Sequence, residues 1–354
     1  MTNSENDSDN FERYSRQMKF AEMGEPAQER LAKSSVLLVG CGALGCAIAN
    51  SLVRAGVGRL RIVDRDWVEL SNLQRQSLFN EADVASELPK SIAAAEHLRK
   101  INSQIEIEPL VADFNFENAK SLIEGCDLIL DGTDNFEARF LMNDCSIKYS
   151  IPWVYGGCLG CEGQTMTIIP DQTPCLNCVM LDGPPAPGTT ATCDTAGILE
   201  PIISLTAAVQ TLEAIKILSG NLDAISPYLQ VFDLWENRHR QVKVSTLLGN
   251  ENCPTCKQGQ FKWLSGELGS ESSALCGRNA VQLSFTNRAG DAKCDLDSLE
   301  SRLTTVGTVT RNKFFLRLDV GDHVLTLFPD GRAIVKGTEE IAVAKRIYAQ
   351  YIGN

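Results

Sequence analysis

Short apolar runs alternate with helical periods from about residue 30 to residue 245. Runs typical of buried strands occupy residues 35–39, 58–64 and 126–131, and the last of these is almost entirely apolar. Helical patterns lie between and after them, including 90–102 and an amphipathic segment, 201–219, that Pro201 opens and Gly220 follows. This βαβ alternation predicts a doubly wound α/β fold, with a mainly parallel sheet and a Rossmann-like nucleotide-binding half.

The pattern changes after residue 262. A polar segment rich in glycine and serine, 264–273, is typical of a flexible linker, and β-like runs follow at 280–285, 313–320, 323–328 and 333–336. Gly321-Asp322 predicts a hairpin turn, and 339–351 a final helix. We therefore expect a disordered tail (1–10), a main α/β domain (11–262), a linker (263–275) and a small α+β module (276–354).

Charge and composition narrow the class of protein. Lysine and arginine number 33 against 45 acidic residues, a net charge of −12, which disfavours general binding to a nucleic-acid backbone. No apolar run approaches the ~18 residues of a membrane span. The first ten residues are polar and acidic, unlike a secretion signal. We expect a cytoplasmic protein with neither nucleic acid nor membrane as a partner.

A glycine-rich loop follows the first predicted strand. Gly40-Cys-Gly42-Ala-Leu-Gly45 opens a helix, where glycines permit a tight turn and let backbone amides approach a phosphate. Asp64 ends the next strand, where a carboxylate can accept a hydrogen bond from ribose. Alone, this pattern favours a dinucleotide, and a purely structural glycine turn is the alternative.

The polar segment after Asp64 favours a different nucleotide. Residues 64–76 form a polar string unlike the apolar site that nicotinamide requires, and a lysine follows at position 90. Side chains suited to an extended triphosphate are Asn72, Arg75, Gln76 and Lys90. For Arg75 or Lys90 taken singly, an ordinary solvated surface charge is the simpler interpretation.

As a set, these residues resemble the MoeB/ThiF/HesA family, bacterial relatives of the ubiquitin-activating enzymes. The matching strings lie within residues 11–257, at 13–17, 40–45, 64–76, 131–139, 196–201 and 210–220. The resemblance implies that the carboxylate of a ubiquitin-like sulfur carrier ending in Gly-Gly attacks the α-phosphate of ATP. An acyl-adenylate and pyrophosphate are the implied products, in molybdopterin, thiamine or thiolated-tRNA synthesis.

The resemblance also implies residue roles. Asp64, with Asp66 nearby, would hold the ribose, Asp134 would be linked to Mg²⁺, and the phosphates would contact Asn72, Arg75 and Lys90. Arg16 matches an arginine that enters the neighbouring subunit's site, which implies a homodimer; a helix-surface arginine is the alternative. Cations and Mg²⁺ suit this reaction because two anions must meet.

Three other functions stay open at this stage. A tRNA-modifying adenylating enzyme is disfavoured by the acidic charge and by the paired cysteines. A non-catalytic scaffold of the same fold would bind the carrier without activating it, but such relatives usually lack the arginine or aspartate that this chain retains. An NAD-dependent oxidoreductase becomes remote once the polar string is considered.

Thirteen cysteines indicate metal or thiol chemistry. Two CxxC pairs, Cys175/Cys178 and Cys253/Cys256, supply four thiolates for one tetrahedral site. Zinc is the predicted metal, in a structural role, since no ligand position stays open. Chance pairs or a redox pair are the alternatives.

Cys193 precedes a predicted helix N-terminus, a position that favours the thiolate. The resemblance implies that it accepts the activated carrier as a thioester or joins persulfide exchange; an inert, half-buried thiol is the alternative. Cys276 is a weaker candidate for handling sulfur. Packing roles are expected for Cys41, Cys46, Cys126, Cys145, Cys158 and Cys161.

Overall fold

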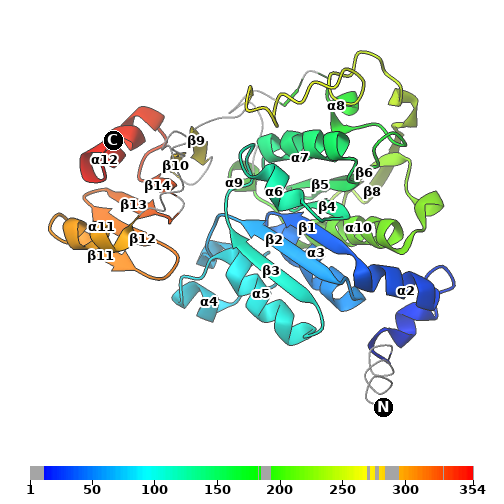
Figure 1. Cartoon of the computed structure of the whole chain (residues 1–354), viewed down its shortest axis with the longest axis horizontal. Helices are drawn as coiled ribbons and strands as arrows, with labels where there is room; N and C mark the ends of the chain where they lie inside the picture. Colours follow the sequence, from blue (N-terminus) through cyan, green and yellow to red (C-terminus); the bar gives the residue numbers. More distant parts are fainter. Residues whose placement is uncertain are drawn as a thin grey trace. The chain divides into compact units, whose positions relative to one another are not determined.

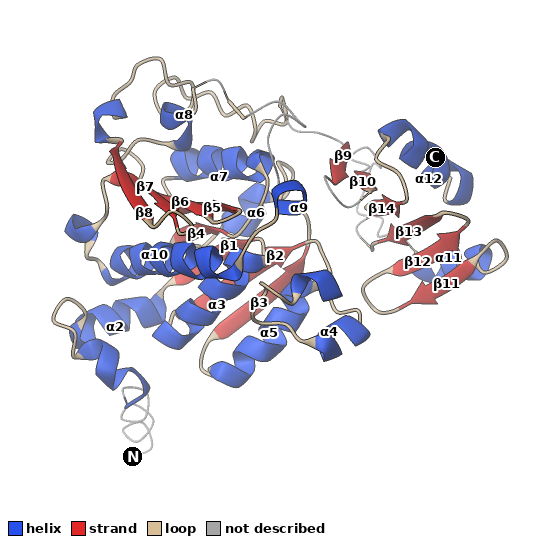
Figure 2. Cartoon of the chain, turned by 180° about the vertical axis from the view of Figure 1, so that it is seen from behind, coloured by secondary structure: helices blue, strands red, loops and turns tan. Residues whose placement is uncertain are grey.

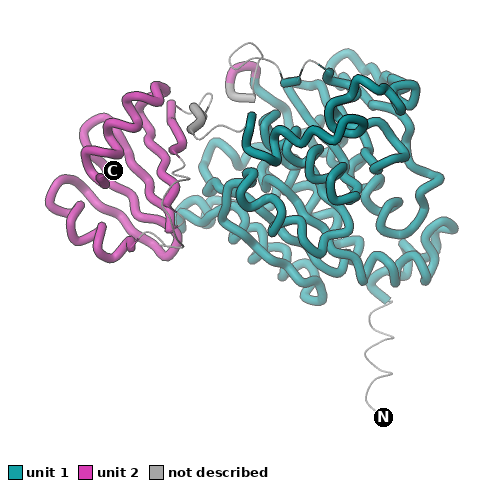
Figure 3. The backbone as a smooth tube through the Cα atoms, turned by 45° about the horizontal axis from the view of Figure 1, so that its top comes forward, with its two compact units in different colours: residues 1–185, 197–269 teal, residues 186–196, 270–354 magenta. Residues whose placement is uncertain are grey.

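The computed structural model describes residues 12–181, 183–184, 193–268, 272–275, 279–283, 295–329 and 331–353 (Figure 1). Two compact units divide the chain: unit 1 is Met1–Pro185 with Gly197–Gly269, and unit 2 is Ala186–Ala196 with Ser270–Asn354 (Figure 3). The predicted tail 1–10 lies outside the described residues. The domain limits drawn from the sequence stay predictions.

An eight-stranded sheet forms the centre of unit 1, in the order β3-β2-β1-β4-β5-β6-β7-β8 (Figure 1). From β3 to β5 the strands are parallel, and from β5 to β8 they are antiparallel. The predicted α/β class is confirmed. The strands are β1 (Ser35–Val39), β2 (Arg59–Asp64), β3 (Glu106–Val111), β4 (Leu128–Asp131), β5 (Trp153–Leu159), β6 (Glu162–Ile168), β7 (Tyr228–Asp233) and β8 (Arg238–Lys243).

Helices cover both faces of this sheet (Figure 2). One core cluster includes residues of α2 (Gly24–Lys33), α3 (Ala43–Ala55), α5 (Lys90–Ile101) and α10 (Glu200–Ser219). The second includes residues of α6 (Ala119–Ile123), α7 (Phe136–Tyr149) and α8 (Leu176–Val179). Because both faces are covered, β1 is apolar throughout: Val36 and Leu38 join the first cluster, Leu37 and Val39 the second. Short elements are α4 (Glu81–Ala85), η1 (Leu70–Asn72), η2 (Leu222–Ala224) and η3 (Ser245–Leu247).

Helix α10 is not amphipathic in the way that its sequence predicts. Its buried side chains include Gln210 and Glu213, whereas Leu212 is 51% exposed. Among the described residues, α10 is also the one helix long and apolar enough to cross a membrane. It packs against α3, β5 and β6, and about half of its apolar window is buried inside the protein. We therefore interpret it as a core helix, a role that accounts for its apolar composition.

Unit 2 is built on a six-stranded antiparallel sheet in the order β11-β12-β13-β14-β10-β9. The expected turn at Gly321-Asp322 is confirmed, since Val320 pairs with His323 across it. The prediction missed α11, β9 and β11. The elements are α9 (Cys193–Ala196), β9 (Ser272–Leu275), β10 (Ala280–Leu283), α11 (Leu296–Leu303), β11 (Thr308–Arg311), β12 (Leu316–Val320), β13 (His323–Leu327), β14 (Ala333–Lys336) and α12 (Ile341–Tyr351).

The start of the expected linker has defined partners in unit 1. Trp263 stacks on Phe140 of α7, with ring centroids 5.6 Å apart. The backbone amides of Trp263 and Leu264 donate to the Asp144 carboxylate, at 3.0 and 3.2 Å. Residues 263 and 264 are therefore held against α7.

Burial of Asp144 raises its pKa to about 6, although the two amides and the Thr255 hydroxyl donate to it. When an acid has a higher pKa in the folded state than in the unfolded state, the protein loses stability as pH rises from the lower value to the higher one. We expect the unfolding free energy of the wild type, relative to Asp144→Asn, to fall by about 3 kcal/mol between pH 4 and above pH 6. Urea titrations of both proteins across this range measure it, and a constant difference between them would contradict it.

Candidate functional site

The glycine loop connects β1 to α3 and crosses a second loop that follows β4. Gly40 has φ +85°, and a Cβ there would lie 2.7 Å from the Gly132 carbonyl oxygen. A Cβ on Gly45 would lie 2.1 Å from the carbonyl oxygen of Gly40. Gly40 and Gly45 are thus required for packing, and their contacts hold the loop of Gly132 beside the glycine loop.

Gly42 has a different environment. It caps the N-terminus of α3 with φ −77°, and a Cβ there would meet no atom closer than 3.9 Å. Packing therefore does not require glycine at this position. A Cβ would be in ordinary van der Waals contact there, and the amides at this helix start suit a phosphate group.

Substitution separates the two kinds of glycine. Gly42→Ala should fold normally and bind ATP at least about tenfold more weakly, about 1.4 kcal/mol, because its methyl group occupies the phosphate space. Gly45→Ala should instead lose about 1–3 kcal/mol of stability through its clash with Gly40. Calorimetric ATP titration and thermal unfolding of both variants check this; unchanged ATP affinity in Gly42→Ala would contradict it.

Asp64 links the glycine loop to the next strand end. One of its carboxylate oxygens accepts from the Cys41 amide at 2.6 Å and the other from the Asp66 amide at 2.7 Å. Burial raises the pKa of Asp64, and the nearby Lys90 opposes this. The Lys90 side chain is only 3% exposed, and its Nζ lies 3.3 Å from Asp66. The structure thus gathers Asp64, Asp66 and Lys90 around the glycine loop.

The loop from 70 to 76 supplies the other predicted phosphate contacts. Gln76 is buried, and among the described residues its Oε1 has no hydrogen-bond partner. Its Nε2 lies 4.0 Å from the Cβ position of Gly42. Asn72 accepts from the Glu69 amide, and Arg75 donates to the Ser71 carbonyl at 2.9 Å. The helix N-terminus and the buried lysine fit the phosphates of a nucleotide, whereas the unused Gln76 oxygen can accept only from a donor such as a hydroxyl.

Asp134 lies in the loop after β4. Hydrogen bonds from Arg139, a residue with no role predicted from sequence, hold this loop in place. The fully buried carboxylate of Asp131 accepts a hydrogen bond from Arg139 Nε at 3.0 Å. Arg139 Nη2 donates to the carbonyls of Thr133 (2.8 Å) and Gly156 (3.0 Å). Burial opposes the charge on Arg139, but the facing carboxylate outweighs it and raises the arginine pKa. Arg139 thus joins β4, the Asp134 loop and β5, leaving Asp134 itself exposed.

Arg16 is exposed within the helical residues 12–18, away from the glycine loop of its own chain. Neighbouring side chains fix this helix to the far ends of two others: Gln17 donates to the Ala55 carbonyl of α3, and Arg13 to the Ile101 carbonyl of α5. Since the glycine loop lies at the opposite end of α3, the structure does not bring Arg16 into this site.

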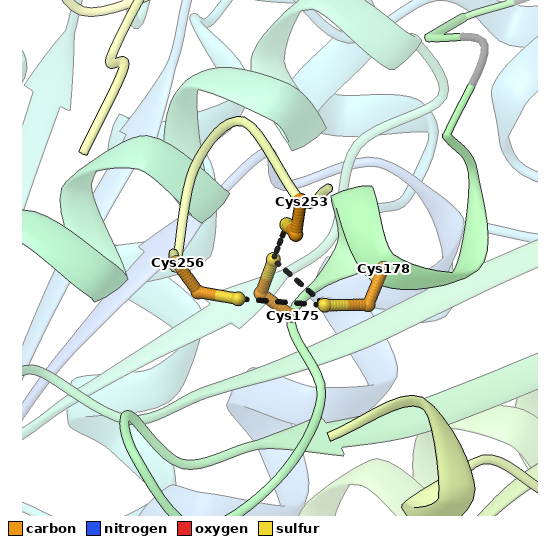
Figure 4. Close-up of side chains that lie close together, drawn as sticks. All are labelled: Cys175, Cys178, Cys253 and Cys256. Atoms are coloured by element: carbon orange, nitrogen blue, oxygen red, sulfur yellow. Dashed lines mark hydrogen bonds between the residues drawn. The ribbon is translucent and has the colours of Figure 1, made fainter. Parts of the chain in front are cut away.

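The four paired cysteines meet in one cluster (Figure 4). Their sulfur atoms all lie within 4.8 Å of one another, with Cys175 3.8 Å from Cys178 and 3.6 Å from Cys253, and Cys178 3.4 Å from Cys256. Tetrahedral zinc with bonds of about 2.3 Å separates its sulfurs by about 3.8 Å. The donor set and spacing therefore fit a structural Zn²⁺ that connects α8 to the loop at 253–256.

The remaining cysteines differ in exposure. Cys193 begins α9, but its side chain lies outside the described residues, as does Cys276. Cys158 and Cys161 are half-buried. The others outside the cluster that the structure describes are buried, as expected: Cys41, Cys46, Cys126 and Cys145.

The solved structures support the fold alone. Escherichia coli MccB with MccA-N7isoASN aligns with a TM-score of 0.60 over 70% of this chain and 74% of that one, at 20% identity. Selenomethionine PaaA aligns with a TM-score of 0.56 over 67% of this chain and 74% of that one, at 24% identity. Both similarities agree with the α/β architecture described above.

Sequence relatives are more similar. The sulfur carrier protein ThiS adenylyltransferase of Bacillus subtilis (strain 168) is 44% identical over 96% of this chain and 99% of its own length. The Anopheles gambiae adenylyltransferase and sulfurtransferase MOCS3 is 39% identical over 70% of this chain, which is 54% of its own length. The model of the ThiF family matches residues 14–255, so the predicted resemblance is confirmed and this chain belongs to the ThiF family.

Proposed function

We propose that this protein uses ATP to adenylate the C-terminal carboxylate of a ubiquitin-like sulfur carrier protein and releases pyrophosphate. The observation that carries this proposal is the N-terminus of α3 at Gly42, which lies beside Asp64 and the buried Lys90. A relative named ThiS adenylyltransferase, matched over nearly the whole chain, supports the enzyme class and the kind of substrate. The alternative of a carrier-binding scaffold is disfavoured because Lys90 and the backbone amides at the start of α3 lie together beside Asp64.

The reaction joins a carboxylate oxygen to the α-phosphorus and breaks the bond from that phosphorus to the bridging oxygen of pyrophosphate. We propose that the amides around Gly42 bind phosphate oxygens and that Asp64 accepts from the ribose hydroxyls. Lys90 and Arg75 would offset the charge that accumulates on the phosphates. Asp134 would hold Mg²⁺, which screens the repulsion between carboxylate and triphosphate when bound.

We propose a homodimer, because Arg16 lies too far from the glycine loop of its own chain to act at that chain's nucleotide. Helix α3 runs from Ala43 to Ala55, about 18 Å at 1.5 Å per residue. Arg16 lies next to Gln17, which is bonded to the Ala55 end, whereas the glycine loop begins at the Ala43 end. That separation exceeds the reach of one arginine side chain. We therefore propose that Arg16 serves the site of a second copy.

Mixing two inactive variants tests this sharing. Arg16→Ala should still bind ATP but lose adenylation. Lys90→Ala should also lose adenylation, because it removes a contact to the phosphates. In mixed dimers one site carries neither substitution, so up to about a quarter of all sites should regain activity by random pairing. Pyrophosphate exchange of the mixture measures this, and activity no higher than the sum of the separate variants would contradict it.

Pyrophosphate exchange with purified carriers tests the function itself. The protein is incubated with ATP, Mg²⁺, labelled pyrophosphate and, in turn, each ubiquitin-like carrier of the same genome, beginning with a ThiS-type carrier. We expect exchange only with a carrier whose terminal Gly-Gly is intact, and none with the same carrier lacking its last glycine. Exchange with no carrier would reject the proposal.

A further inference from the structure

Gln210 is a buried polar residue of α10 that the function proposed above does not use. Its side chain is fully buried, and its Nε2 donates to the carbonyls of Asp131 at 2.9 Å and of Val154 at 3.3 Å. Within the described part of the chain, its Oε1 has no hydrogen-bond partner. Burying an amide oxygen unpaired costs stability, and an apolar side chain of similar size would avoid that cost. The reason for glutamine at this position therefore lies in the two bonds that its Nε2 makes.

These bonds lie where β4 and β5 separate. The two strands pair as far as Leu130 and Val154, and Asp131, the last residue of β4, lies one position beyond. Arg139 of α7 bonds the Asp131 side chain, whereas Gln210 of α10 bonds its backbone carbonyl. Because α7 and α10 belong to the core clusters on opposite faces of the sheet (Figure 2), the end of β4 is held from both sides.

The peptide that joins Asp131 to Gly132 is consequently held at both of its polar atoms. Its carbonyl accepts from Gln210, and its amide donates to the carbonyl of the last residue of β1 at 2.8 Å. A Cβ on Gly132 would lie 2.3 Å from the Gly40 carbonyl oxygen, so this peptide lies directly against the glycine loop. Asp134 follows two residues later. The orientation of this one peptide therefore determines how the Asp134 loop lies against the glycine loop.

Gly156 of β5 leaves the space that the Gln210 amide occupies. A Cβ at Gly156 would lie 2.3 Å from Cδ and Oε1 of Gln210 and 2.4 Å from its Nε2. Gly156 does not have a positive φ, so its backbone conformation does not require glycine. The close approach of the amide does. Gly156 and Gln210 are thus matched to each other, and a methyl group at 156 would fill part of the same space.

We propose that Gln210 is a positioning residue for adenylation: it holds the peptide between Asp131 and Gly132 and thereby fixes the Asp134 loop against the glycine loop. This role rests on the function proposed above, which assigns the nucleotide to these two loops. Gln210 itself touches no substrate. Losing its hydrogen bonds should therefore slow the reaction more than it weakens ATP binding, because the Gly132 amide still holds the peptide to β1.

Gln210→Met tests the role of the donor, since methionine is of similar size but cannot donate a hydrogen bond. Pyrophosphate exchange with ATP, Mg²⁺ and the ThiS carrier of Bacillus subtilis is measured below the unfolding temperature, beside calorimetric titration of ATP. We expect kcat to fall about tenfold or more, while the KM and the affinity for ATP change less than about threefold. A kcat within about twofold of the wild type would overturn this role. So would an equal loss of ATP affinity, because the defect would then lie in the glycine loop.

A double variant separates hydrogen bonding from packing. Gly156→Ala/Gln210→Ala places a methyl group in the space that the amide leaves, but it supplies no donor. We expect it to be more stable in thermal unfolding than Gly156→Ala alone, in which the methyl group meets the amide, while its exchange stays low. Recovery of exchange to the wild-type rate would show that filling the space is sufficient and would overturn the positioning role.

Thr211→Val is the matched control. Thr211 follows Gln210 in α10 and is buried, and among the described residues its Oγ1 has no hydrogen-bond partner, so this variant should keep the wild-type rate. An equal loss of exchange in Thr211→Val would show that any change in this part of α10 slows the reaction, and would overturn the role of Gln210. No exchange in the wild type would overturn the proposed function and this role with it, whereas full exchange in Gln210→Met would overturn this role alone.

Discussion

Replacing Arg139 by alanine is expected to cause the largest loss of activity among single substitutions away from the nucleotide. The change leaves the Asp131 carboxylate buried without its cation and frees the carbonyls of Thr133 and Gly156. Breaking a buried ion pair in this way costs about 3–5 kcal/mol of stability. Displacing the Asp134 loop by even 1 Å should lower adenylation by about 100-fold or more. Pyrophosphate exchange below the unfolding temperature and urea titration measure the two effects.

Arg139→Lys is the matched control. Lysine keeps the charge that faces Asp131 but cannot donate along the three directions that the guanidinium uses. We expect it to recover much of the stability while adenylation stays low. An Arg139→Lys protein with full activity would show that the charge alone is needed and that the loop requires no positioning by the arginine.

Loss of the cysteine cluster is expected to lower stability by an amount comparable to the loss of Arg139. Cys253→Ala removes one of four sulfurs, so tight binding of one zinc per chain should be lost. A cross-link that closes a loop of this size, 78 residues from Cys175 to Cys253, contributes about 4 kcal/mol by restricting the unfolded chain. Elemental analysis after dialysis and the midpoint of urea unfolding measure zinc content and stability.

Two comparisons make the zinc experiment decisive. Removing the metal from the wild type with a chelator should lower its stability to about that of Cys253→Ala and should change that variant little. Cys126→Ala, which removes a buried thiol outside the cluster, should retain one zinc per chain. A wild-type protein that is purified without zinc and keeps its stability in chelator would contradict a structural metal.

The elements that could be predicted from sequence are those whose pattern has a local cause. β1 and β4 are buried on both faces, so their apolar runs are continuous. The two CxxC pairs are themselves the four metal ligands, so the sequence identifies the ligand set directly. β8 has all six residues exposed and therefore carries no apolar signal. In α10, buried Gln210 donates to the carbonyls of Asp131 and Val154, a long-range requirement that periodicity cannot reveal.

The candidate site was predictable in its residue types but not in its connections. Asp64 could be identified because motif spacing places it beside the glycine loop, and Lys90 because a triphosphate needs cations and the family resemblance includes it; the structure brings both there. Arg139 belongs to a matching string, yet its role depends on a partner eight residues earlier, across a strand end and a loop. That spacing, an aspartate ending an apolar strand and an arginine in the following helix, is the signal that could have found it.

The cysteine cluster also imposes an order on how the protein is made. Cys175 and Cys178 precede α10, β7 and β8 in the chain, while Cys253 and Cys256 follow all three. As the chain leaves the ribosome N-terminus first, the first pair waits without its partners until nearly the whole of unit 1 has been synthesised. Metal capture then becomes a late checkpoint: a chain truncated before residue 253 cannot close its site, however well its glycine loop has folded.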